Sequence, residues 1–117
     1  MIVEQCFIDK GWGYEEVLTN TNKYCAKILH INKDKKMSWH FHKIKDETFY
    51  VETGKVCLYY GESNYLENSS SIVLKPGMIF NVPPGLKHML VGIENSRVFE
   101  FSTQHFDDDS YRIIKGD

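Results

Sequence analysis

The strongest constraint on the fold of this chain is a succession of short apolar segments, each followed by a turn signal. β-branched and aromatic residues gather in these segments, and Gly, Pro, Asn and Ser separate them. We expect strands at 24–31, 37–42, 47–51, 55–60, 71–74, 78–82, 88–93 and 97–101. No segment keeps the apolar spacing of an amphipathic helix beyond about two turns. The pattern predicts an all-β fold, either an antiparallel sandwich or a small closed barrel.

Length and composition fit one such unit. The chain has 117 residues, of which 42% are hydrophobic and 26% are charged, a composition typical of globular proteins rather than disordered ones. We therefore expect a single domain over residues 1–117. The tail after Thr103 is predicted to add a terminal strand or a short helix outside the barrel.

Charge and cysteine usage exclude several classes of partner and compartment. The formal net charge is -2, so no global positive field would recruit nucleic acid or anionic lipid. No apolar run approaches the ~20 residues of a membrane-spanning helix. Cys6, Cys25 and Cys57 lie far apart and form no CxxC pair. An odd number of cysteines cannot all pair in intramolecular disulfides, which favours a reducing compartment. We expect a cytoplasmic protein that binds neither nucleic acid nor membranes.

Two histidines stand one residue apart inside a predicted strand. Because side chains alternate across a strand, His40 and His42 should project from the same face. Glu47 follows a predicted hairpin turn and should face the pair as a cross-strand neighbour. His88 begins a later strand, after a Pro-Gly turn. An isolated pair of this kind is a weak signal, and its ordinary explanation is two half-buried histidines of a sheet.

The spacing of these residues resembles the two motifs of the cupin superfamily. The first motif is matched at His40, His42, Glu47 and Gly54, with Asp34 in place of its leading glycine. The second is matched at Gly77, Pro83, Gly85 and His88, with Gly92 in place of its final asparagine. The resemblance implies a small antiparallel jelly-roll β-barrel that encloses one divalent metal. It also implies the metal ligands His40, His42, Glu47 and His88.

The chemistry of that ligand set agrees with the resemblance. Three imidazoles and one carboxylate suit manganese, iron, cobalt, nickel or zinc and leave positions open for water or substrate. The set contains no thiolate, which argues against a closed structural zinc site. A cupin that keeps the barrel but has lost the metal is the alternative.

Further segments resemble the cupin domain of type II mannose-6-phosphate isomerases. They are 10–15, 37–51, 82–88 and 100–113, with Lys45 where that family has arginine. The resemblance implies a sugar or sugar-phosphate substrate and an isomerase or epimerase that acts through a metal-stabilised enediolate. Candidate catalytic residues are Glu47, Glu100 and Lys45. Candidate phosphate-binding residues are Lys45, Lys87, Arg97 and Arg112.

Other functions and an oligomeric state follow from the same residues. The ligand set also suits a mononuclear iron dioxygenase, and the barrel could serve as a non-catalytic small-ligand binder. Trp39 and Phe41 alternate with the histidines and should point outward, which predicts a homodimer that covers them. Alternatively, the N-terminal segment through Trp12 and Tyr14 covers both aromatics. His30 and His105 match no metal motif and are expected to be ordinary histidines.

Overall fold

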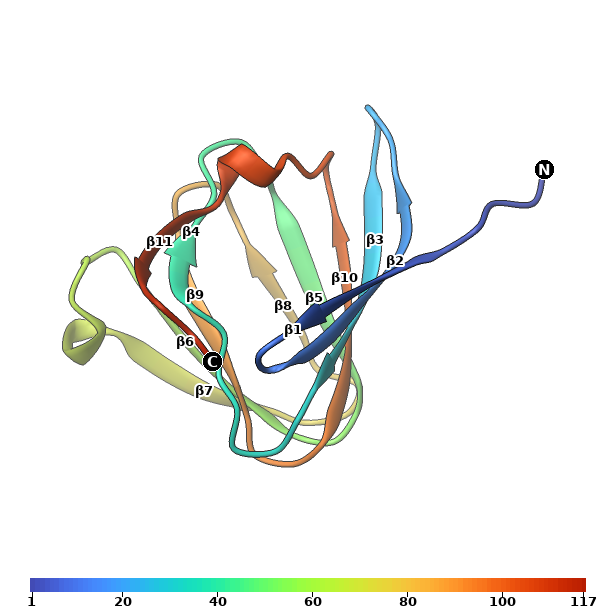
Figure 1. The fold of residues 1–117 in the computed structure, drawn as a ribbon. Helices are drawn as coiled ribbons and strands as arrows, with labels where there is room; N and C mark the ends of the chain where they lie inside the picture. The colour runs from blue at the N-terminus through green and yellow to red at the C-terminus, as the bar shows by residue number, and fades with distance from the viewer.

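Two antiparallel sheets face each other in the computed structural model, which describes residues 1–117 (Figure 1). The first sheet has six strands, in the order β1 (Cys6–Lys10), β2 (Gly13–Asn20), β3 (Cys25–Ile31), β10 (Ser96–Ser102), β5 (Glu47–Thr53) and β8 (Ile79–Val82). The second has five, in the order β11 (Tyr111–Ile114), β4 (Trp39–Phe41), β9 (Lys87–Gly92), β6 (Val56–Gly61) and β7 (Ser70–Leu74). The helical elements are two single 3-10 turns, η1 (Leu66–Asn68) and η2 (Asp107–Asp109). Neither approaches the length and apolarity of a membrane-spanning helix.

The predicted all-β jelly-roll is confirmed, but the sheets do not close into a barrel. Each of the eight expected segments contains a strand, and the tail adds β11, which pairs with β4. β1 and β2 were not predicted, because their residues do not alternate between apolar and polar. Glu15 of β2 points into a polar cavity between the sheets, so the usual apolar signal of an inward position is missing there.

The interior between the sheets is shared by an apolar core and that polar cavity. Alternate residues of the central strands supply the core, for example Phe49 and Val51 of β5 and Val56 and Leu58 of β6. Phe49 also lines the cavity. The cavity is therefore bordered by close-packed side chains, which hold its polar groups in fixed positions.

The two departures from the cupin motifs have local structural explanations. Asp34 has a φ of 66°, a left-handed conformation in which glycine is usual and aspartate is among the tolerated alternatives. Its N–H donates to the carbonyl of Gly92 at 2.8 Å. A Cβ on Gly92 would lie 2.4 Å from the carbonyl oxygen of Asn32. Gly92 thus permits the close approach of the turn at residues 32–36 to β9.

Trp39 and Phe41 are covered within the chain, contrary to the expectation that they need a partner. Trp39 is fully buried, and its indole N–H donates to the carbonyl of Asn64 at 3.0 Å. Phe41 stacks on Tyr111 of β11, with ring centroids 5.1 Å apart. These two contacts come from the segment after β6 and from β11. The argument for a homodimer from these two aromatics is wrong, and the dimer itself stays a prediction.

Candidate metal centre

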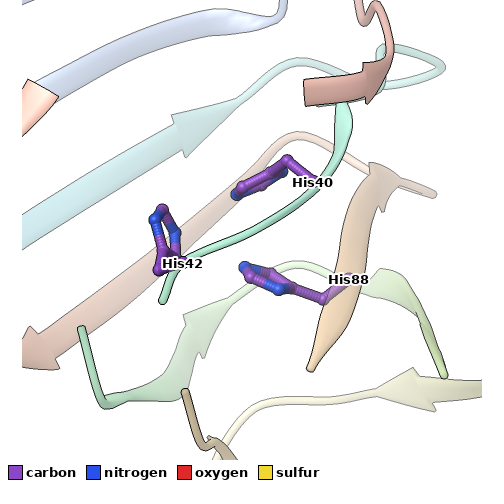
Figure 2. Close-up of side chains that lie close together, drawn as sticks. All are labelled: His40, His42 and His88. Atoms are coloured by element: carbon purple, nitrogen blue, oxygen red, sulfur yellow. The ribbon is translucent and has the colours of Figure 1, made fainter. Parts of the chain in front are cut away.

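Three imidazoles converge from neighbouring strands of the second sheet. His40 lies in β4, His42 follows that strand directly, and His88 lies in β9 opposite His40. Figure 2 shows the three rings turned toward one another. Their ring centroids are 4.3 to 5.5 Å apart, and one ligand nitrogen from each lies within 4.8 Å of the others. The predicted shared face of His40 and His42 is confirmed, and the triad could hold a metal ion.

The second nitrogen of each ring fixes its tautomer. Each Nδ1 lies beside a backbone carbonyl oxygen: His40 at 2.8 Å from Ser38, His88 at 2.9 Å from Leu86, and His42 at 3.0 Å from Asp109. A carbonyl can only accept, so the hydrogen is assigned to Nδ1 in all three rings. Each Nε2 then keeps its lone pair free, which is the arrangement expected of metal-binding histidines.

Glu47 reaches the triad from the opposite sheet. The predicted hairpin is wrong, because β4 and β5 belong to different sheets and the chain crosses between them over residues 42–46. Glu47 begins β5 and faces the histidines across the interior. Its Oε1 lies 2.8 Å from Nε2 of His88, and its Oε2 lies 3.8 Å from Nε2 of His42.

One buried atom at this point lacks a hydrogen-bond partner, Nε2 of His88. With Nδ1 carrying the hydrogen, the His88 lone pair faces a carboxylate oxygen at 2.8 Å. Two acceptors this close need a cation or a shared proton between them. The donor set and this unpartnered nitrogen therefore fit a divalent metal ion.

At neutral pH the candidate metal-binding side chains are in the protonation states that bind a metal. Burial lowers the pKa of His42 to about 4 despite the nearby Glu47. Burial and the neighbouring His88 hold the pKa of His40 well below its ordinary value. Burial alone would raise the pKa of Glu47, but the charge of Lys45 holds it below its usual range. His40 and His42 are thus neutral and Glu47 is ionised.

Lys45 joins two buried carboxylates beside the triad. Its Nζ lies 2.9 Å from Oε2 of Glu47, 3.0 Å from Oε2 of Glu100 and 3.3 Å from Nδ1 of His105. Burial would lower the pKa of Lys45, but the two carboxylates raise it, so the side chain stays charged. Burial and the charge of Glu47 raise the pKa of Glu100. Glu100 is therefore the carboxylate of this cluster best suited to take up and release a proton.

These groups open into one cavity of about 760 Å³ between the sheets. Its lining contains five cationic side chains, Lys10, Lys27, Lys45, Arg112 and Lys115. It also contains five carboxylates, Glu15, Glu47, Glu100, Asp107 and Asp117. The protein's own charges in the cavity cancel, and the two innermost lysines are already paired, Lys27 with Glu15 at 3.5 Å and Lys45 as above.

Two of the four candidate phosphate-binding residues line the cavity, and the other two lie outside it. Lys45 and Arg112 line the cavity, whereas Lys87 and Arg97 do not. Lys87 donates to the carbonyl of Glu62 at 2.9 Å. Arg97 lies on the other side of the first sheet, 3.4 Å from Glu52. Side-chain alternation in β10 places Glu100 and Arg97 on opposite faces, and nothing in their local sequence identifies which face borders the cavity.

Sequence reasoning also missed cavity residues. His105 was expected to be an ordinary histidine, yet it contacts Lys45 from the segment after β10. Lys27 of β3 is only 4% exposed and lies between the buried Cys25 and Leu29 on the inner face. A charged residue at an inward position of a strongly apolar strand was a readable signal. His105 offered no comparable signal, because it lies outside any strand.

The fold and site together define a class of protein. Three histidines on or directly after strands of the second sheet face Glu47 of the first sheet, and these four residues are the ones that the two sequence motifs implied. The family model for Cupin matches residues 11–114. The chain belongs to the cupin family.

A sequence relative is more specific. The chain is 34% identical over 110 residues to a D-lyxose ketol-isomerase from Cohnella laeviribosi. The match covers 76% of this chain and 60% of the relative, so this chain spans less than two thirds of that enzyme's length.

Solved structures confirm the fold. The capsular polysaccharide assembling protein CapF from Staphylococcus aureus has a TM-score of 0.80 at 16% identity, covering 96% of this chain and 34% of its own. KdgF from Halomonas sp. has a TM-score of 0.75 at 20% identity, covering 88% of this chain and 91% of its own. An oxalate decarboxylase from Bacillus subtilis has a TM-score of 0.80 at 13% identity, covering 93% of this chain and 30% of its own. At these identities the likeness concerns the fold alone.

Proposed function

We propose that this cupin is a metal-dependent isomerase or epimerase of small sugars. The observation that carries the proposal is the adjacency, in one cavity, of a candidate metal site and a buried Lys45–Glu100 pair. The similarity to a D-lyxose ketol-isomerase supports it. Aldose–ketose conversion needs these two functions side by side, because a proton must move between adjacent carbons whose oxygens carry developing charge.

The residues that would hold the metal are His40, His42 and His88, with Glu47 as a fourth ligand from the opposite sheet. Manganese, iron, cobalt, nickel and zinc all accept this set. When bound, such an ion would polarise the carbonyl and hydroxyl oxygens of the reacting sugar carbons. Glu47 completes the set only if its contact with Lys45 leaves one oxygen free, and its Oε1 faces His88 rather than Lys45.

Glu100 is the group that we propose to move the proton. The pKa of Glu100 is raised, whereas the pKa of Glu47 is lowered. Glu100 is therefore the carboxylate that can more readily accept a proton at neutral pH and return it. Lys45 donates to its Oε2 at 3.0 Å and keeps the side chain oriented toward the candidate metal site. Glu100 itself lines the cavity. Lys45 therefore acts by positioning both carboxylates and by offsetting their charges.

The charge balance of the cavity favours a free sugar over a sugar phosphate. Lys27 and Lys45 are the two most buried cations of the cavity and are already paired with carboxylates, so a dianionic phosphate deep in the cavity would have to compete with those pairs. Arg112 is exposed and could hold a phosphate only near the opening. Sugar hydroxyls, in contrast, can both donate to carboxylates and accept from lysines.

The test is isomerisation of D-lyxose, other aldoses and their phosphates by protein loaded with Mn²⁺, Co²⁺ or Zn²⁺. NMR in D₂O would report both ketose formation and exchange of the proton on C2. Glu100→Gln should lower turnover by at least about 100-fold while metal affinity stays within a few fold. The exposed Glu94→Gln is the control. No turnover of any sugar by metal-loaded protein would refute the proposal, and substrate-dependent oxygen uptake with Fe²⁺ would favour a dioxygenase.

A further inference from the structure

One of the three histidines depends on a distant segment for its orientation. His40 and His88 each pair Nδ1 with the carbonyl of the residue two positions earlier in their own segment. His42 instead pairs with the carbonyl of Asp109, which is 67 residues further along the chain. β4 ends at Phe41, so His42 lies outside the strand and lacks the local carbonyl contact that orients the other two rings.

The side chain of the same residue holds the loop that follows His42. The carboxylate of Asp109 accepts backbone N–H groups from Lys43 at 2.9 Å, Ile44 at 3.2 Å and Lys45 at 3.0 Å. Asp109 is 3% exposed, so these hydrogen bonds form away from water. A buried carboxylate that accepts several N–H groups is strongly anchored, because charge-assisted bonds are about twice as strong as neutral ones.

The loop that Asp109 holds carries much of the candidate site. Residues 42–46 cross from the second sheet to the first, outside the strand ladders, and bring both His42 and Lys45 to Oε2 of Glu47. The other anchor near the histidine is the N–H of Gly85, which donates to the carbonyl of His42 at 2.7 Å. That bond fixes the backbone of His42 but leaves its ring free to rotate.

We propose that Asp109 is a positioning residue of the metal centre. Its carbonyl selects the His42 tautomer that directs Nε2 toward His40 and His88, and its carboxylate fixes the loop that sets the position of that ring. The inference rests on the metal site of the proposed function but on no particular reaction. It assigns η2, a single turn near the end of the described chain, to the site.

The first test reads the tautomers directly in metal-free protein. Long-range ¹H–¹⁵N correlation spectra at pH 8 should show the hydrogen on Nδ1 of all three histidines in the wild type. In Asp109→Asn the amide nitrogen opposes one of the loop N–H groups, so the loop and the Asp109 carbonyl shift. His42 should then show mixed tautomers, while His40 and His88 keep theirs.

The second test measures metal affinity. We expect Asp109→Asn to weaken Zn²⁺ binding by about 10- to 100-fold in competition with a chromophoric chelator, the range typical of groups that orient metal ligands. Asp108→Asn is the matched control, because Asp108 is the exposed neighbour in the same turn. It should bind Zn²⁺ as the wild type does.

The outcomes separate this inference from the proposed function. If the wild type binds no metal, the proposed function fails, but the tautomer spectra still decide the role of Asp109. An unchanged His42 tautomer in Asp109→Asn overturns the inference, and so does an equal change in all three rings, which would indicate a general structural role. If the Asn variant does not fold, Asp109→Ser keeps one acceptor for the loop and is subjected to the same two measurements.

Discussion

Replacing Lys45 with methionine is the sharpest test of the buried charge cluster. Methionine keeps the unbranched apolar stem but removes the ammonium group that separates Glu47 from Glu100. Lys45 is 3% exposed, and the two carboxylates are 2% and 5% exposed. The variant therefore places two carboxylates in one buried site without a cation.

The magnitude follows from the distances. At an effective dielectric constant of about 20, each contact near 3 Å contributes about 5 to 6 kcal/mol before desolvation is subtracted. Burying the ammonium group offsets most of this gain, and breaking a buried pair by removing one partner typically costs about 3 to 5 kcal/mol. We expect Lys45→Met to lose stability in that range at pH 8.

The loss should shrink as the pH falls. The pKa of Glu100 is already raised by burial and by Glu47, and removing Lys45 raises it further. A carboxyl whose folded pKa exceeds its unfolded value stabilises the fold at low pH and loses that effect as the pH rises. Lys45→Met should thus recover part of its stability toward pH 5.5, and the double variant with Glu100→Gln should recover part of it at pH 8.

Urea unfolding of the metal-free protein, followed by circular dichroism, measures these differences. Lys55→Met is the matched control, since Lys55 pairs with Glu94 at 3.8 Å with both side chains about half exposed. Such a surface pair contributes under about 1 kcal/mol. A loss below about 1 kcal/mol for Lys45→Met at pH 8, with no pH dependence, would refute the buried-cluster reasoning.

Two further predictions concern His42 and Gly92. Because the pKa of His42 is lowered to about 4 from 6.5, its neutral form stabilises the fold above pH 6.5, and up to about 3 kcal/mol is lost as the pH falls toward 4. Metal-free His42→Gln should show a flatter profile in the same urea experiment, and an unchanged slope would contradict this assignment. Gly92→Ala places a Cβ 2.4 Å from the carbonyl of Asn32, so we expect about 1 to 3 kcal/mol of destabilisation by thermal unfolding. A variant as stable as the wild type would show that the turn moves aside freely.

Side-chain alternation and turn residues, the local rules used on the sequence, correctly predicted the strands and the shared face of the histidine pair. Alternation and turn residues are properties of a few consecutive residues, so they are visible in the sequence. They placed eight segments in strands and put His40 and His42 on one face. The same rules failed at β2, where Glu15 faces a polar cavity rather than a core.

The connection between β4 and β5 shows where local rules stop. A short polar link between two strands reads as a hairpin, yet these strands belong to different sheets. The prediction that Glu47 lies beside the histidines still held. Glu47 reaches the triad from across the interior instead of from a neighbouring strand. Motif spacing encodes which residues meet, but not the path by which they meet.

The sequence by itself determined the all-β class, the cupin family and the residues most suited to bind a metal. Those properties depend on residue types at short, fixed separations. Only the tertiary structure decided that Lys45 is shared by two carboxylates, that Lys87 and Arg97 lie outside the cavity, and that Asp109 supports His42. Each of these relations joins residues distant along the chain, or depends on which face of a sheet borders the cavity, and the packing of the two sheets is what sets both.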